Sequence, residues 1–377
     1  MANDHLGRLH QDLLAQIMAR VDGPSLAAAA CTCSDLRGVA HEEKLWKDVC
    51  HATWPSTQGK RAQNVLGSSA VCFSKFYADA YPLIVYKESE DARGRRWQQT
   101  TPVLPSNLVS FVDVYYKRVC IFSKVLHGIP GANDAGGDEH ACCEGRRQHE
   151  WFMDGPFRID VLNYQDMMSS SQDNDDDGDG SDDEGSEDGE AMGSLLSVPF
   201  VEKKERGCGK LCRKLEENVR LSWVLLDTRT GRAVSLSSWK SVSVQRHWPS
   251  ESDFLMRFGC VVPVEEKVMQ CGPAECMISV RCRLLEREGC LKWMEISMQV
   301  EDKEGAHVTG EKSLKVLEGA LGCERSRYWE EFEKGYGKYV KEKREVRDKK
   351  LKSEQLVDRL SVLSGIGVFS VLCFLAF

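Results

Sequence analysis

The residue types best suited to binding a metal gather in one short stretch of the chain, residues 140–149. His140, Cys142, Cys143 and His149 offer the imidazole and thiolate groups that zinc prefers. The two cysteines are adjacent, however, whereas zinc fingers separate their cysteine ligands by about two to four residues. The Gly- and Asp-containing surroundings favour a solvated loop over a zinc site, and we expect no metal.

Covalent catalysis would need a thiol or hydroxyl held beside a base. The chain has 16 cysteines and nine histidines, but none of them lies in a recognisable catalytic setting, and G-x-S-x-G, P-loop and G-x-G-x-x-G patterns are absent. Cys271 and Cys276, which flank Gly272-Pro273, fit a turn followed by a strand. We therefore expect neither a catalytic residue nor a cofactor.

The start of the chain bears on the state of these thiols. The sequence MANDHLGRLHQDLL has no basic segment followed by an apolar one, so it lacks the pattern of a secretory signal. In a reducing cytosol the cysteines should stay free, and most of them should be small buried hydrophobic residues.

The charge of the chain is concentrated in one acidic run. The formal net charge is −8, and 11 Asp and Glu residues without any Lys or Arg lie between Asp173 and Glu190, so the rest of the chain carries −8 + 11 = +3. Nucleic-acid binding normally needs a dense basic surface. A nearly neutral remainder does not provide one, so we expect no nucleic-acid partner.

The acidic run belongs to a longer Ser-, Asp-, Glu- and Gly-rich tract, residues 167–193. This composition offers too little apolar surface to offset the entropy of ordering the chain, so the tract is predicted to be a disordered insertion. A solvated spacer is the main interpretation. A basic partner, or acid-directed phosphorylation at Ser181 or Ser186, are the alternatives.

Residues 5–54 are patterned as short helices. Gly23-Pro24-Ser25 should end the first helix and begin the second, with the Ser25 side chain as a cap. Ser34-Asp35 resembles another cap, and a further amphipathic helix is predicted over 69–81. The apolar residues of the first segment recur at the spacing of one helical face: Leu13, Leu14, Ile17, Met18 and Val21.

These helices resemble an F-box of nearly full length. The opening Leu-Pro-x-(Asp/Glu)-Leu-Leu of that family corresponds to Leu9-His10-Gln11-Asp12-Leu13-Leu14, its Cys-x-x-(aromatic/Leu)-Arg segment to Cys33–Arg37, and its closing Leu-Trp to Leu45-Trp46. His10 replaces the usual proline, and Leu36 stands where tryptophan is common. The resemblance implies that the unit binds a Skp-type adaptor, and through it a cullin–RING ubiquitin ligase.

An F-box is too small to bury all of its own apolar surface, so its apolar positions should pack on that adaptor. The alternative is an ordinary helical subdomain packed on the rest of the chain. The residues expected to bind the adaptor, with Leu13, Ile17 and Leu26 at the centre of the surface, are Leu9, Leu13, Leu14, Ile17, Leu26, Cys33, Leu36, Leu45 and Trp46.

From about Leu108 the hydrophobic period changes from 3.6 to 2, the period of strands. Two strands are predicted around Lys117-Arg118, and another ends at a turn over Asp227–Gly231. Several short alternating strands without a βαβ rhythm predict an antiparallel sandwich. The region resembles the β-rich half of plant F-box proteins, and more weakly a lectin-like sandwich. Trp239, His247 and Trp248 are candidates for binding a target, although tryptophans are more often core residues.

The chain ends in a charged segment, Tyr339–Arg359, followed by the uncharged sequence LSVLSGIGVFSVLCFLAF. These 18 residues would span ~27 Å as a helix, close to the ~30 Å of a hydrocarbon core. We expect a tail anchor in an endomembrane, with the rest facing the cytosol; without it the protein would be cytoplasmic or nuclear. The alternatives are a buried C-terminal helix or strand, or a dimerisation helix using Gly365 and Gly367.

Together these patterns predict an α+β chain: a three-helix F-box (5–54), a helical connector (55–104), a β-rich substrate-recruiting domain (105–325), a charged helix (326–359) and a hydrophobic tail (360–377). The F-box resemblance implies a non-catalytic substrate-recognition subunit of a Skp–cullin–F-box ubiquitin ligase that binds an unidentified target. The alternative is a membrane-tethered, lectin-like binding module outside a ligase.

Overall fold

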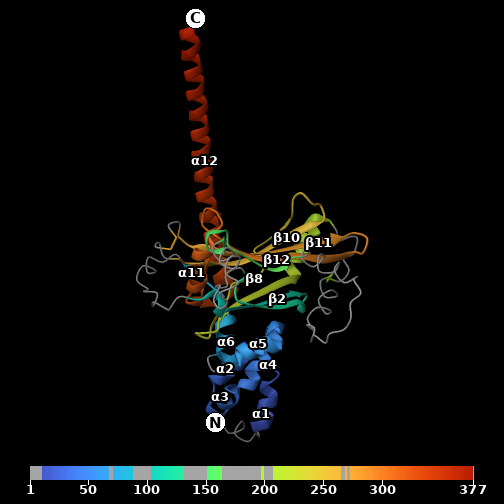
Figure 1. Ribbon diagram of the computed structural model, residues 1–377. Helices are drawn as coiled ribbons and strands as arrows, with labels where there is room; N and C mark the ends of the chain where they lie inside the picture. The colour runs from blue at the N-terminus through green and yellow to red at the C-terminus, as the bar shows by residue number, and fades with distance from the viewer. Residues whose placement is uncertain are drawn as a thin grey trace, which may run out of the picture.

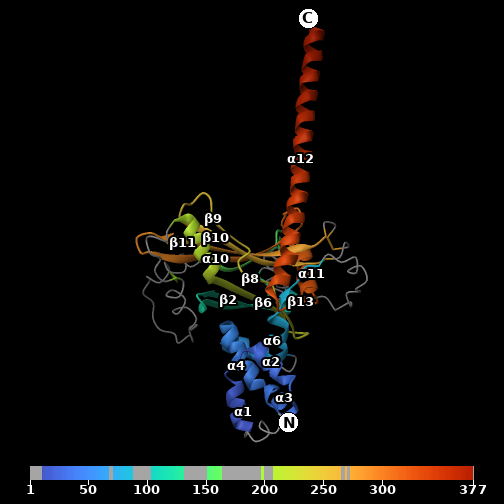
Figure 2. The same ribbon diagram turned by 180° about the vertical axis from the view of Figure 1, so that it is seen from behind.

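The computed structural model describes residues 11–67, 71–87, 103–130, 151–163, 197–198, 207–264, 268–269 and 272–376. The described elements form layers along one axis (Figure 1): an N-terminal helical unit, two β-sheets, and a long C-terminal helix that projects beyond the second sheet. Figure 2 shows the same order from behind, with the two termini at opposite ends. Leu9, the candidate zinc ligands at 140–149, Cys271 and the acidic tract at 167–193 lie outside the described residues.

The helical unit contains more helices than the sequence predicts. In residues 11–53 four short helices replace the expected three, because Glu42 adopts an extended conformation (φ −62°, ψ 118°) and separates the third helix from the fourth. The elements are α1 (Gln11–Met18), α2 (Gly23–Ala30), α3 (Ser34–Ala40), α4 (Glu43–Thr53), the 3₁₀ turn η2 (Pro55–Gln58), α5 (Lys60–Leu66) and α6 (Phe73–Ala80).

The caps of these helices also differ from the prediction. The side chain of Asp22, and not that of Ser25, caps α2 by accepting a hydrogen bond from the Ser25 backbone N–H at 3.0 Å. This hydrogen bonding lowers the pKa of Asp22. Cys33 occupies the N-cap position of α3 without a side-chain hydrogen bond, so the predicted Ser34-Asp35 cap is wrong. Pro24 lies in the first turn of α2, where its missing N–H costs no helical hydrogen bond.

The first sheet faces the helical unit. Its strand order is β13-β1-β7-β6-β2-β3, with β8 paired to β6; β1 runs parallel to β7 and the other pairs are antiparallel. The predicted turns are confirmed: Lys117 and Arg118, both with positive φ, join β2 to β3, and Gly231 (φ 62°) lies in the turn between β6 and β7. The strands are β1 (Leu83–Ile84), β2 (Leu108–Tyr116), β3 (Val119–His127), β6 (Val219–Asp227), β7 (Arg232–Ser235), β8 (Trp239–Lys240) and β13 (Arg325–Ser326).

The second sheet packs on the other side of the first. Its order is β4-β12-β11-β10-β9, and β5 also pairs with β12. The strands on either side of residues 164–196, β4 and β5, therefore both pair with β12 in the same sheet. The strands are β4 (Arg158–Asn163), β5 (Ser197–Val198), β9 (Ser243–Arg246), β10 (Asp253–Val262), β11 (Ala274–Leu285) and β12 (Cys290–Glu301).

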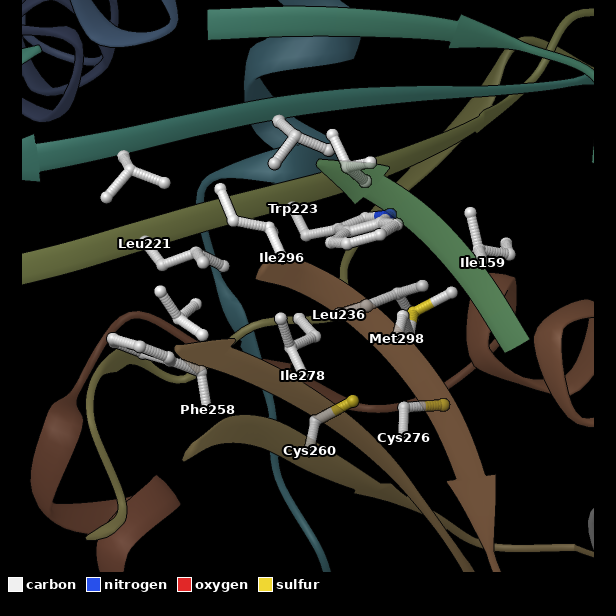
Figure 3. Packing of buried hydrophobic residues seen from close by; sticks show 14 of the residues in the cluster. Ile159, Leu221, Trp223, Leu236, Phe258, Cys260, Cys276, Ile278, Ile296 and Met298 are labelled. Carbon is white, nitrogen blue, oxygen red and sulfur yellow. The ribbon is translucent and has the colours of Figure 1, made fainter. Parts of the chain in front are cut away.

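The main hydrophobic core lies between the two sheets, as expected of a sandwich. Figure 3 shows Leu221 and Trp223 of the first sheet opposite Phe258, Ile278 and Met298 of the second, with all five side chains fully buried. At ~25 cal/mol per Å² of apolar surface removed from water, such side chains contribute most of the stabilisation. The predicted α+β architecture, with antiparallel-rich sheets, is confirmed.

A second core joins the helical unit to the outer face of the first sheet. Trp54, Phe76 and Tyr77 from the helices pack there with Phe111 of β2 and Val224 of β6. Every residue of β2 is buried, because one of its faces contacts the other sheet and the other contacts the helices. The described residues 55–67 and 71–80 of the predicted connector thus contribute to this core.

Further helices follow the first strands in the described part of the chain, among them α10 (Cys208–Asn218), α11 (Gly310–Leu321) and α12 (Trp329–Ala376). The predicted division at Arg359 is not a structural boundary, since α12 continues through it without interruption. At 1.5 Å per residue, the 48 residues of α12 span ~72 Å.

Candidate functional site

The first helix exposes apolar side chains that nothing in the described chain covers. Leu13 and Ile17 are 49% and 48% exposed, and their i, i+4 spacing places them on the same face of α1. Leu14 and Met18, each one position further along the helix, lie on the adjacent side and are buried in the helical unit. The apolar stripe of α1 is therefore wider than the part that the helical unit covers, which indicates that its exposed side binds a partner.

Several of the residues predicted to form this surface are instead buried beneath it. Leu14, Leu26, Leu45 and Trp46 belong to the core shared with α6 and the first sheet, and Leu26 has no exposed surface. The prediction of a surface centred on Leu13, Ile17 and Leu26 is therefore corrected at Leu26, because the connector helices supply the unit with a core of its own.

The remaining predicted residues take intermediate positions. Cys33 and Leu36 are half-buried at the start of α3. The indole of Trp46 donates a hydrogen bond to the carbonyl of Ala40 at 2.7 Å, which fixes α4 against the end of α3. Trp46 thus positions the helices within the unit and leaves the exposed face to α1.

Specific polar contacts fix the helical unit on the first sheet. The indole N–H of Trp54, which follows α4, donates to the hydroxyl of Ser222 on β6 at 2.9 Å. The hydroxyl of Tyr115 on β2 donates to the carbonyl of Thr53. Because both indole and hydroxyl are largely buried, misalignment of the two parts would leave unpaired polar groups, so these contacts define one relative orientation.

Asp113 provides the most buried of these contacts. Its carboxylate is fully buried on β2 and accepts hydrogen bonds from the Ser56 backbone N–H (2.8 Å), the Ser56 hydroxyl (2.6 Å) and the Ser123 hydroxyl (2.8 Å). Burial raises the pKa of Asp113 to about 6, while the hydrogen bonds from Ser56 and Ser123 act in the opposite direction. The group connects η2 to the sheet in a dry setting and does not face solvent.

The predicted target-binding residues differ in exposure and in the contacts they make. Trp239 on β8 is 38% exposed and packs on Tyr115, with ring centroids 5.3 Å apart. Trp248 is 86% exposed beyond the end of β9, and His247 next to it is half-buried. Trp239 belongs to the first sheet through β8, whereas Trp248 follows β9 of the second sheet. Trp248 is the most exposed of the three residues.

The base of α12 is docked on the second sheet by one apolar face. Phe332, Gly335, Tyr336 and Tyr339 recur at helical spacing and are buried or half-buried. A Cβ atom at Gly335 would lie 2.5 Å from the carbonyl oxygen of Tyr86, so only glycine allows the helix to approach this closely. The sequence analysis missed this face, although its i, i+3, i+4, i+7 pattern could have revealed it.

Ion pairs hold the next three turns of α12, up to Lys350, against the second sheet and the turn that follows β12. Lys343 is 9% exposed, and its ammonium group contacts Glu275 of β11 at 2.7 Å and Glu301 of β12 at 2.8 Å. Burial lowers the pKa of Lys343, but Glu275 and Glu301 outweigh burial, and the net shift is upward. Lys303–Glu342 and Lys350–Glu304, both at 2.7 Å, flank this pair.

The rest of α12 has no contacts with the described chain. All residues described over 351–375 are exposed, and an 18-residue window of the helix has a mean hydropathy of 1.7 with none of it buried. By length and composition this helix could cross a membrane. The predicted alternative of a buried C-terminal element is wrong for the described residues.

The described cysteines are free thiols, and Cys50, Cys260, Cys276 and Cys282 are buried. Across the described part of the chain, His, Cys, Asp and Glu side chains form no group of three that could hold a metal ion.

Comparisons with known proteins point the same way as the geometry. Residues 8–52 match the F-box-like family. The chain is 30% identical to F-box protein At2g27310 of Arabidopsis thaliana, covering 98% of this chain and 95% of that protein. It is 28% identical to probable F-box protein At2g36090 of the same organism, covering 98% and 92%. No solved structure matches.

Proposed function

Because this chain belongs to the plant-type F-box proteins, we propose that it is the substrate-recognition subunit of a Skp–cullin–F-box ubiquitin ligase. Subunits of this kind bring a target protein to a cullin-bound RING partner, which delivers ubiquitin to a lysine of the target. The chain then needs no catalytic residue of its own. Its contribution is to raise the effective concentration of the target near the ligase.

The exposed face of α1 carries this proposal. Leu13 and Ile17 would bury their aliphatic side chains in the Skp-type adaptor, while Leu14, Leu26 and Trp46 hold α1 in place from below. Half-exposed aliphatic side chains gain most by such burial, since each methylene removed from water contributes ~0.8 kcal/mol.

The β domain would bind the target. Trp248 supports this role because a tryptophan with 86% of its surface exposed is costly to leave in water, and tryptophans often dominate protein interfaces. The shared core between the helices and the first sheet supports a fixed relative orientation of adaptor and target.

The apolar end of α12 would anchor the protein in a membrane, with the ligase in the cytosol. Lys349, Lys352 and Arg359 precede or border the apolar segment, in agreement with the tendency of basic residues to stay on the cytosolic side. Such an anchor would place the ligase beside membrane-bound targets.

Carbonate extraction tests the anchor. The full chain should stay in the membrane pellet, and a chain ending at Arg359 should be soluble.

Adaptor binding is tested with Leu13→Ala/Ile17→Ala. We expect at least a tenfold weaker affinity for a Skp-type adaptor, measured by calorimetry, because two aliphatic groups are lost from the interface. The control is Val119→Ala, which removes an aliphatic side chain that is 65% exposed on β3. If the folded double variant binds as tightly as the control, the assignment of the adaptor surface is wrong.

A membrane-tethered binding module outside a ligase is the competing function. The β-sandwich and the apolar helix are compatible with it, whereas the exposed α1 face favours the ligase subunit. Affinity purification of the full chain separates the two, since only the ligase subunit should bring a cullin with it.

A further inference from the structure

We infer that α12 holds the β domain at a fixed distance and orientation from an anionic bilayer. The turn over residues 302–306 and the exposed basic residues Arg347, Lys349 and Lys352 form the surface that faces the lipid. This inference depends on the membrane anchor proposed above. It adds an orientation: the second sheet lies toward the lipid and the helical unit points away from it.

The first observation is that the base of α12 cannot pivot on the β domain. Gly335 lets the helix backbone approach Tyr86, and Tyr339 is fully buried against Tyr86 and Val261. Phe332 and Tyr336 stack on the same face, with ring centroids 5.6 Å apart. Packing at this density allows few alternative positions of the helix.

The second observation is the position of the ion pairs. Lys343 lies between carboxylates of two adjacent strands, so it resists sliding of α12 along either strand. Lys350 reaches Glu304 two turns further on. Exposed pairs contribute little singly, but moving the helix would leave the buried ammonium of Lys343 without its two carboxylate partners, which is strongly unfavourable.

The third observation is the short distance between the docked base and the apolar segment. Residues 351–359 continue the same helix and span ~14 Å at 1.5 Å per residue. The polar layer of one leaflet is ~5–8 Å thick. With the apolar segment in the hydrocarbon, Glu304 and its turn would therefore lie within ~10 Å of the headgroups.

Charge on this part of the helix fits a membrane surface. Arg347, Lys349 and Lys352 are exposed on α12, and residues 347–359 carry five basic and three acidic side chains, a net charge of 5 − 3 = +2. Basic side chains close to an anionic leaflet are attracted to its negative surface potential. The helical unit lies at the end of the molecule opposite to the C-terminus (Figures 1 and 2), so its adaptor surface would remain accessible from the cytosol.

The orientation is tested by energy transfer from the protein to a membrane dye. The full chain is inserted into phosphatidylcholine vesicles containing phosphatidylserine, with a fluorophore encoded at Ala306 or at Asp35, both exposed. We expect strong transfer from Ala306 and at least fivefold weaker transfer from Asp35. If transfer from the two positions is equal while the protein remains in the vesicles, the inferred orientation is wrong but the proposed anchor stands. If the protein never enters the vesicles, the proposed membrane anchor itself is wrong.

Matched variants test the rigidity itself. Gly335→Ala should release the base of α12, and the two transfer efficiencies should converge, whereas Gly337→Ala meets no atom within 4 Å and should behave as the natural chain. Because Gly335→Ala could also disturb folding, a second variant inserts four glycines after Ser353, which leaves the docked base intact. Unchanged transfer in the inserted variant would show that the helix is not what orients the domain.

The lipid contact is tested in the same vesicles. Replacing Arg347, Lys349 and Lys352 by glutamine should reduce the initial binding to vesicles containing phosphatidylserine at least tenfold. Binding to pure phosphatidylcholine should change little. Equal reductions on both lipids would exclude an anionic surface as the partner.

Discussion

Asp113 is a charged residue type placed where charge is unfavourable. It lies between the helical unit and the first sheet with no exposed surface, and its hydrogen bonds join Ser56 of η2 to Ser123 of β3. Burial raises its pKa to about 6 from the usual aspartate value of 3.8. Between pH 3.8 and about pH 6, Asp113 is therefore protonated in the folded chain and ionised in the unfolded chain.

This difference predicts a pH dependence of stability. The stabilising contribution of Asp113 is fully present below pH 3.8 and is lost as the pH rises through about 6. The loss amounts to roughly 2–3 kcal/mol at ~1.4 kcal/mol per pKa unit. Compared with Asp113→Asn, the natural chain should gain stability between pH 7 and pH 4 in urea denaturation. Asp35→Asn, at an exposed position, serves as the control; a constant difference between Asp113→Asn and the natural chain would contradict the prediction.

Leu13 and Leu26 are the same residue type in opposite settings. Leu26→Ala should lower the free energy of unfolding by about 2–5 kcal/mol, because Leu26 is fully buried and leaves a cavity. Leu13→Ala should change it by less than about 0.5 kcal/mol, since the side chain is half exposed. Thermal or urea denaturation measures both, and equal losses would show that α1 is packed differently.

At the scale of elements, Lys343 predicts how firmly α12 is held. Lys343→Ala leaves Glu275 buried without its cation and should cost about 3 kcal/mol or more. Lys341→Ala removes an exposed lysine of the same helix and should change stability by less than about 0.5 kcal/mol. Limited proteolysis within 329–350 should accelerate only in Lys343→Ala. Protection of both variants would mean that apolar packing alone holds the helix.

The sequence predicts those elements whose patterns are local. Alternation in 276–284 gives a strand with Cys276, Ile278 and Val280 inward, as β11 shows, because a sheet covered on one face by core has a period of two. The sequence Trp-Val-Leu-Leu over 223–226 is apolar at every position. Such a run indicates a strand buried on both faces, and it was the available sign that helices cover the first sheet.

Other features depend on contacts that are distant in the sequence. The pair Trp54–Ser222 joins residues 168 positions apart, and Lys343–Glu301 joins residues 42 apart. Composition and periodicity do not reveal such partners. For this reason Leu26 was predicted on the adaptor surface, and α12 was divided at Arg359, where only the polarity changes.

At the scale of the whole molecule, the shared core predicts cooperative unfolding. Phe76 of α6 and Phe111 of β2 are both fully buried and in contact, with ring centroids 5.4 Å apart. Separating the helical unit from the sheet would expose these rings to water. Calorimetry of a chain ending at Arg359 should therefore show one transition with equal calorimetric and van't Hoff enthalpies. Two resolved transitions would mean that the units fold independently.

The same core limits how this protein can be recombined with others. A chimera cut after Pro55, just beyond the family motif, would separate Trp54 from Ser222 of β6 and from the rings of Phe76 and Tyr77 on α6. The transplanted motif would lose its support, and the remaining chain would expose the apolar side of α6 to water, a surface prone to aggregation. The exchangeable part of this chain therefore extends through α6 and includes the sheet beneath it, so the smallest portable unit is the motif together with its β-sandwich.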